Sequence, residues 1–154
     1  MKRATVYKRG ESVIVHAMSK TTAGVWILTP PVACVSMADT VRLSQAVVSA
    51  LNNSTEDVVH PTSWKGRFDP VLKLAGVKTF SAFIKTCRCL EVELDAGQIT
   101  LIPTRNLGSS GGFEPIGMKI GPVEFTDQGT LGKWLLSAFD SATDNSKKTT
   151  ASSD

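Results

Sequence analysis

The sequence of 154 residues lacks the features that mark several classes of protein. It has no apolar run of roughly 18 to 20 residues, the length of a membrane-spanning helix, and no apolar segment follows the charged N-terminus as in a secretory signal. We therefore expect a cytoplasmic protein without membrane contact. The three cysteines, Cys34, Cys87 and Cys89, are an odd number, which predicts reduced thiols rather than a disulfide scaffold.

Sequence motifs of catalysis are also missing. The chain contains no GxxxxGK[ST], HExxH, CxxC or GxSxG pattern. His16 lies within an apolar stretch that is typical of a strand, and His60 precedes a proline, so we expect a hydrogen-bonded, half-buried histidine and a loop histidine. Cys87 and Cys89 share one face of a predicted strand, because successive side chains alternate between faces, and they are expected to be buried structural residues rather than metal ligands. We expect no enzyme, and no catalytic, cofactor-binding or metal-binding residues.

Charge is unevenly distributed along the chain. Residues 1–20 hold five basic side chains and one acidic one, and residues 60–90 hold six and one. Residues 91–154 hold five basic side chains against nine acidic ones. Such an asymmetry can steer a charged partner, but a net charge of +3 is small for a dedicated nucleic-acid binder.

Hydrophobic alternation predicts two halves with the same order of elements. In the first half, residues 3–53, short β-rich runs centred on residues 6–8, 13–18 and 25–28 precede Pro30-Pro31, and residues 32–35 are then expected as a short edge strand. Asp39 or Thr40 caps a helix over residues 40–52, which has apolar residues at helical spacing.

The second half, residues 87–142, repeats this order. Strands are expected at residues 90–94, 98–103, 113–116 and 123–125, with a turn at Asp95-Ala96-Gly97 between the first two. Thr126 or Asp127 caps a helix over residues 129–142. A connector, residues 60–86, carries two short helices, one of them with Asp69 as its N-cap and a stop at Gly76, and the other capped by Thr79.

Equivalent pieces of the two halves lie 86 to 88 residues apart, a spacing that predicts an internal duplication. The expected fold class is α+β, with two pseudo-repeated antiparallel ββββα halves, each a curved sheet followed by a helix, joined by a short helical linker, an architecture like that of Whirly and Pur-type proteins. Residues 1–142 form one domain, and residues 143–154, which carry no apolar side chain larger than alanine, form a disordered tail. Trp26, Phe113, Trp134 and Phe139 are expected to anchor the core.

The connector holds the most unusual composition in the chain. Trp64, Lys65, Arg67 and Phe68 interleave aromatic and basic side chains on a predicted loop. The aromatic residues could close the ends of the core, anchor a protein interface, or stack on nucleic-acid bases while the basic residues pair with phosphates. Arg105 and Asn106 begin a second stretch expected to be an exposed polar loop, which could also be a plain connector.

Three segments resemble immunity proteins of bacterial contact-dependent growth inhibition systems: VYKRGESVIV at residues 6–15, HPTSWKGRFDPVL at residues 60–72, and LIPTRNLG at residues 101–108. The resemblance extends over about residues 3–140. It implies a cytoplasmic protein that is not an enzyme and that binds and neutralises the C-terminal toxin domain, often a nuclease, of a cognate effector.

The candidate toxin-binding residues are Trp64, Lys65, Arg67, Arg105 and Asn106. The net charge of +3 departs from the acidic character common among immunity proteins that face basic nucleases. Either the partner is acidic where it makes contact, or the acidic face bearing Glu91 and Glu93 is the interface. The alternative function is a single-stranded nucleic-acid-binding module of Whirly or Pur-like architecture, which would lose affinity steeply with added salt.

Overall fold

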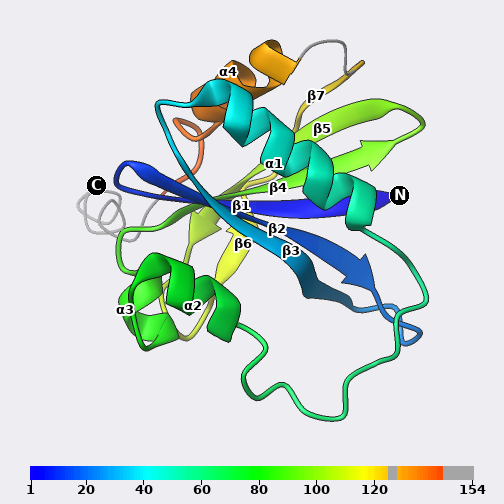
Figure 1. Ribbon diagram of the computed structural model, residues 1–154, viewed down its shortest axis with the longest axis vertical. Helices are drawn as coiled ribbons and strands as arrows, with labels where there is room; N and C mark the ends of the chain where they lie inside the picture. Colours follow the sequence, from blue (N-terminus) through cyan, green and yellow to red (C-terminus); the bar gives the residue numbers. More distant parts are fainter. Residues whose placement is uncertain (125–127, 144–154) are drawn as a thin grey trace.

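The computed structural model describes residues 1–124 and 128–143 (Figure 1). Its elements follow in the order β1 (Lys2–Arg9), β2 (Ser12–Lys20), β3 (Trp26–Ser36), α1 (Thr40–Asn53), α2 (Asp69–Ala75), α3 (Phe80–Ile84), β4 (Arg88–Asp95), β5 (Gln98–Asn106), β6 (Phe113–Pro115), β7 (Ile120–Glu124) and α4 (Gln128–Ala138). The strands form one antiparallel sheet in the order β3-β2-β1-β4-β5-β6, and β7 pairs with β5. The predicted α+β class is confirmed, whereas the expectation of two separate sheets is wrong.

One face of the sheet carries the larger core. Successive side chains of a strand point to opposite faces, so Ala4 and Val6 of β1 lie on the same face as Leu90 and Val92 of β4, their cross-strand partners. These four residues are buried against α1 and α4, which lie on one side of the sheet in Figure 1. The leucines and valine of β4 alternate with acidic residues, as the sequence predicted.

The opposite face is covered only in part. A second core of Tyr7, Ile14, Cys87 and Cys89 packs beneath α2 and α3, which contribute Val71 and Phe83. Because β1 and β2 are covered on both faces at this end, their central residues are buried without interruption rather than in alternation. No helix among the described residues is long and apolar enough to cross a membrane.

Local signals explain where several elements begin and end. Asp39 caps α1, with its Oδ1 accepting a hydrogen bond from the Arg42 amide at 3.0 Å, and Thr79 caps α3 in the same way. Gly76 ends α2 in a left-handed conformation, as predicted. Asp69, however, lies inside α2, whose N-cap is Phe68, so its predicted capping role is wrong.

Two other boundaries differ from the sequence prediction. Pro30-Pro31 does not divide the strand, because a register shift opposite His16 and Ala17 accommodates both prolines, and β3 continues to Ser36. The first half therefore has three strands instead of four. Helix α4 ends at Ala138 rather than at residue 142, and the chain then turns back through three short-range hydrogen bonds.

Thr143, the first residue of the predicted tail, is paired with the sheet. Thr143 pairs with β5, since the Asn106 amide donates to the Thr143 carbonyl at 3.2 Å and the Thr143 amide donates to Thr104 at 3.1 Å. Residues 144–154, and the predicted helix caps Thr126 and Asp127, lie outside the described residues.

The two halves share one sheet and differ in their edge strands. β2 and β5 flank the central β1–β4 pair. Beyond β2 lies β3 with 11 residues, whereas β5 pairs with two short strands, β6 with 3 residues and β7 with 5. The internal duplication and the Whirly or Pur-like architecture are not confirmed and stay predictions.

Candidate interaction surface

A pocket of about 320 Å³ opens on the partly covered face of the sheet. Strands β2 and β3 supply Met18, Trp26 and Leu28, and the connector supplies Trp64 and Arg67. We call it the tryptophan pocket. Its remaining lining residues are Tyr7, His16, Ile27 and Phe68.

The connector holds Trp64 over the pocket through contacts at the end of β2. The backbone of Val58 pairs with Lys20 and Thr22, and His60 Nδ1 lies 3.0 Å from the Thr21 hydroxyl. The Trp64 ring then meets His60 edge-on, with 5.7 Å between ring centroids. About half of Trp64 (53%) remains exposed, which leaves an indole face available for contact.

Arg67 forms the basic wall of the pocket. Its Nη1 donates to the Leu28 carbonyl at 3.2 Å, which ties the connector to β3. Its Nε is buried and has no hydrogen-bond partner. Lys65, two residues earlier, is exposed.

Arg3 lies beside the pocket, in the cross-strand row formed by Leu28, Met18 and Arg3. Its guanidinium carbon is 5.1 Å from the centroid of the Trp26 ring, a cation–π arrangement. Nη2 pairs with Glu93 at 2.7 Å, while Nε is buried without a partner. Among the described residues, the buried side-chain polar atoms without a partner are the Nε atoms of Arg3 and Arg67.

A row of titratable side chains lies next to the pocket on the same face. The His16 ring bonds the Ala17 carbonyl through Nδ1 at 2.9 Å and the Tyr7 hydroxyl through Nε2 at 3.1 Å. A carbonyl oxygen only accepts, so Nδ1 carries the hydrogen and Nε2 accepts from Tyr7. His16 is fully buried rather than half-buried, and burial lowers its pKa from 6.5 to about 4.

Glu91 occupies the same row and is linked to β1. It accepts a hydrogen bond from the Thr5 hydroxyl at 2.9 Å, and burial raises its pKa from 4.5 to about 7. Burial also raises the pKa of Tyr7 well above its ordinary value. His16 and Tyr7 are therefore uncharged near neutral pH, and Glu91, with a pKa of about 7, is only partly ionised there. These side chains support the pocket rather than presenting full charges to a ligand.

The cysteines are unsuited to nucleophilic chemistry at the core. Cys87 and Cys89 are buried, as predicted, and burial raises the pKa of the Cys87 thiol to about 12. Cys34 is exposed, and all three thiols are free. Within residues 1–124 and 128–143, no three His, Cys, Asp or Glu side chains gather into a group that could hold a metal ion.

The structure brings together only some of the predicted site residues. Trp64 and Arg67 share the pocket, and Glu93 joins it through Arg3. Arg105 is exposed on β5, which is separated from β3 by three strands, and it pairs with Glu114 at 3.4 Å.

The expectation that Asn106 is exposed is wrong. Asn106 is buried, and its amide nitrogen donates to the carbonyls of Ile84 and Cys87 at 2.6 and 2.9 Å. Its side-chain oxygen accepts from the Gly108 amide at 2.8 Å. The side chain is fully used in holding α3 and the following turn against β5.

Sequence reasoning missed the contribution of Trp26 and Arg3. Trp26 was expected in the main core but is half-buried on the opposite face, under the Arg3 guanidinium. The alternation of side chains along β1 and β2 is visible in the sequence, and it could have predicted that Arg3 and Met18 share one face of the sheet. The pairing of β2 with β3, which adds Trp26, could not be read from the sequence.

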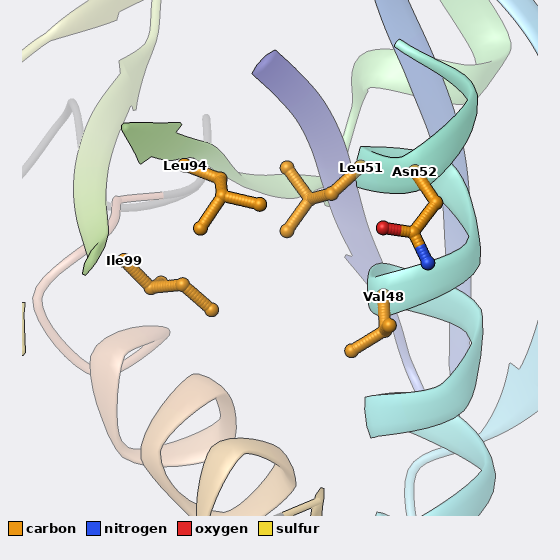
Figure 2. Close-up of a pocket in the computed structure, with 5 residues that line it drawn as sticks. All are labelled: Val48, Leu51, Asn52, Leu94 and Ile99. Carbon is orange, nitrogen blue, oxygen red and sulfur yellow. The ribbon is translucent and has the colours of Figure 1, made fainter. Parts of the chain in front are cut away.

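A second pocket, of about 240 Å³, lies on the helix-covered face (Figure 2). In Figure 2, Val48 and Leu51 of α1 point across a gap toward Leu94 and Ile99 of the β4–β5 hairpin. Asn52 is the polar member of these five lining residues. The pocket is an apolar crevice at the margin of the core, without a charged group to orient a ligand.

Comparison with known proteins shows the fold. No protein-family model matches the chain, and no curated protein matches it. The fold is that of a chain in the CdiA-CT/CdiI toxin and immunity complex from Yersinia pseudotuberculosis, with a TM-score of 0.74 and 16% identity over 92% of this chain and 97% of that one. A protein of unknown function from Neisseria meningitidis is similar with a TM-score of 0.73 and 16% identity, over 92% of this chain and 95% of that one.

Proposed function

We propose that this chain is an immunity protein of a contact-dependent growth inhibition system, which binds and neutralises the C-terminal toxin domain of the cognate effector in the cytoplasm. The observation that carries the proposal is the likeness in fold to a chain of a toxin and immunity complex, which extends over nearly the full length of both chains. The three sequence segments that resemble such immunity proteins support it independently.

The described surface is suited to binding rather than to catalysis. Beside the tryptophan pocket, His16 and Tyr7 are buried and uncharged near neutral pH, and the exposed groups around it include the Trp64 indole and the Lys65 ammonium. Such anchors dominate the binding energy of many protein interfaces. Trp64, Lys65, Arg67 and Arg105 are the proposed contact residues, and we propose that the toxin is a nuclease.

The internal hydrogen bonds of the buried Asn106 and the partly buried Glu91 limit what these side chains can contribute to binding. The side chain of Asn106 makes its hydrogen bonds within the protein, and Glu91 accepts a hydrogen bond from Thr5. Glu93 is held by Arg3, so the acidic face is half neutralised. The tryptophan pocket is therefore favoured over this acidic face as the interface.

Complex formation tests the proposal directly. The purified chain is mixed with the toxin domain encoded by the neighbouring upstream gene, and the mixture is analysed by size-exclusion chromatography with light scattering. We expect a complex of one chain and one toxin domain that persists in 0.5 M salt, and no complex with an unrelated toxin domain. Binding to a random oligonucleotide with steep salt dependence, in the absence of toxin binding, would support the nucleic-acid alternative instead.

A further inference from the structure

We infer that the tryptophan pocket receives an acidic side chain of the toxin domain, an Asp or Glu flanked by an apolar residue, which pairs with Arg67 beside Trp26 and Trp64. This inference rests on the proposed function, because it names the partner chemistry of the proposed interface. It goes beyond the likeness in fold, which says nothing about the residues in contact.

The first argument is the state of the two arginines. Buried polar groups in folded proteins are nearly always hydrogen-bonded, and an unsatisfied donor in the interior costs about 1 to 3 kcal/mol. Both buried side-chain polar atoms without a partner in the described residues belong to arginines at this pocket. A guanidinium edge that includes Nε matches a carboxylate, which accepts two parallel hydrogen bonds.

The second argument is the position of the two cations. Arg67 contacts the Leu28 carbonyl, and Arg3 lies two strands away in the same cross-strand row, on the order of 10 Å distant. The Arg3 charge is already matched by Glu93, whereas no ion pair within the described residues holds Arg67. Arg67 is therefore a positive charge that lines the pocket without an acidic partner among these residues, and Arg3 positions the Trp26 ring.

The third argument is the shape and polarity of the lining. Met18, Leu28 and the two indoles form apolar walls around a volume of about 320 Å³, enough for one large side chain. A polyanionic strand fits this place poorly, because Glu93 lies in the same cross-strand row as Leu28, Met18 and Arg3, and Glu91 lies in the next row. A single carboxylate with an apolar neighbour satisfies both the cation and the walls.

The test measures the affinity of the purified toxin domain for variants of the full chain. Arg67→Gln and Arg67→Lys should each weaken binding at least tenfold, since lysine keeps the charge but lacks the Nε edge. Trp64→Ala should weaken binding by a similar factor. Because about half of this side chain is exposed, we expect the variant to keep its fold, which circular dichroism checks. The matched control is Arg42→Gln, at an exposed position of α1, and this variant should bind with an affinity within twofold of that of the parent chain.

A double-mutant cycle identifies the acidic partner. Each Asp and Glu of the toxin domain is changed to its amide, and each variant is measured against the parent chain and Arg67→Gln. We expect one acidic residue whose loss costs at least tenfold with the parent chain and less than twofold with Arg67→Gln. The absence of any such coupled residue, or unaltered affinity of the Arg67 variants, would overturn the inference while leaving the proposed function intact.

Two other outcomes separate the alternatives. If the parent chain binds no toxin domain, the proposed function fails and the inference with it. If a twelve-nucleotide thymidine strand binds, and Arg67→Gln abolishes that binding without changing toxin affinity, the pocket is a nucleic-acid site and the inference is wrong.

Discussion

At the scale of single residues, polar side chains that form hydrogen bonds within the protein hold neighbouring segments in place. Asn106 and Glu91 both come from strands at the centre of the second half, and both were predicted as interface residues. Their hydrogen bonds are made inside the protein instead. Because an unpaired buried group is costly, these residues are better understood as structural than as contacts.

Replacing Asn106 with alanine should destabilise the fold strongly. The change leaves the Ile84 and Cys87 carbonyls and the Gly108 amide without their partner, at a cost of about 3 kcal/mol. Urea unfolding measures the loss. The control is Asn53→Ala, which removes one exposed bond to the Ser49 carbonyl and should change stability by less than about 0.5 kcal/mol. Equal effects of the two changes would contradict the assigned role of Asn106.

Glu91 should make stability fall as pH rises. Its pKa in the folded state, about 7, lies above the ordinary value of 4.5, so the folded chain binds more protons than the unfolded chain between these values. The stabilising contribution is complete below pH 4.5 and is lost as pH rises through 7. Relative to Glu91→Gln, the parent chain should lose on the order of 2 kcal/mol between pH 4 and pH 8.

The measurement is urea unfolding of both proteins at the two pH values. His16 titrates in the opposite sense, since its lowered pKa removes stability as pH falls from 6.5 through about 4, but it is common to both proteins and cancels. Arg3, Glu93 and Cys89, the charged or ionisable neighbours of Glu91, are also unchanged. The exposed Glu114→Gln serves as control, and a difference between parent and Glu91→Gln that is the same at both pH values would refute the account.

At the scale of elements, the contact between α1 and α4 joins the two halves over the main core. Gly132 allows it, because a Cβ atom at this position would collide with the Thr40 carbonyl oxygen and would lie 2.8 Å from the Ser44 hydroxyl oxygen. The first turn of α1 therefore rests directly on the backbone of α4. Neither helix could approach as closely with a larger residue there.

Gly132→Ala should destabilise the protein by about 1 to 3 kcal/mol, although alanine is the better helix former. The collision with backbone forces the helices apart and weakens the burial of Leu43 and Leu131. Thermal unfolding by circular dichroism provides the measurement, and Ser137→Ala, at an exposed position of the same helix, is the control. A melting temperature at or above that of the parent would show that α1 and α4 pack differently.

The sequence predicted those elements whose signals are local. Helix α1 was identified by its cap and apolar spacing, and α2 and α3 by Gly76 and Thr79. The β4–β5 turn was identified by Ala96 and Gly97, which adopt the positive φ angles that such a turn requires. The strand break at Pro30-Pro31 was predicted wrongly, because a bulge in the pairing with β2 is not visible in one strand alone.

The residues of the candidate site also divide into those with a local sequence signal and those placed by contacts between distant segments. Trp64 and Arg67 are three residues apart, so their proximity could be predicted from the connector alone. Arg3 and Trp26 join them through the register of β1 with β2 and of β2 with β3, which depends on contacts between distant segments. Composition could not distinguish the exposed Arg105 from the buried Asn106 beside it.

At the scale of the whole molecule, one sheet serves two purposes. Its helix-covered face holds the main core, and its other face is covered only at one end, so that the tryptophan pocket opens beside a second core. The basic surplus of residues 60–90 includes the connector that forms one wall of this pocket. A positive, aromatic surface of this kind favours an acidic contact region on the proposed partner.

The most direct test of the account is survival of cells that produce the toxin. The toxin domain encoded by the neighbouring upstream gene is induced in cells that contain either this chain, its Arg67→Gln variant, or an empty vector, and colony numbers are counted with protein levels matched. The account predicts full survival with the parent chain, at least tenfold fewer colonies with the variant, and death with the vector. Death in the presence of abundant, folded parent chain would contradict its function as an immunity protein.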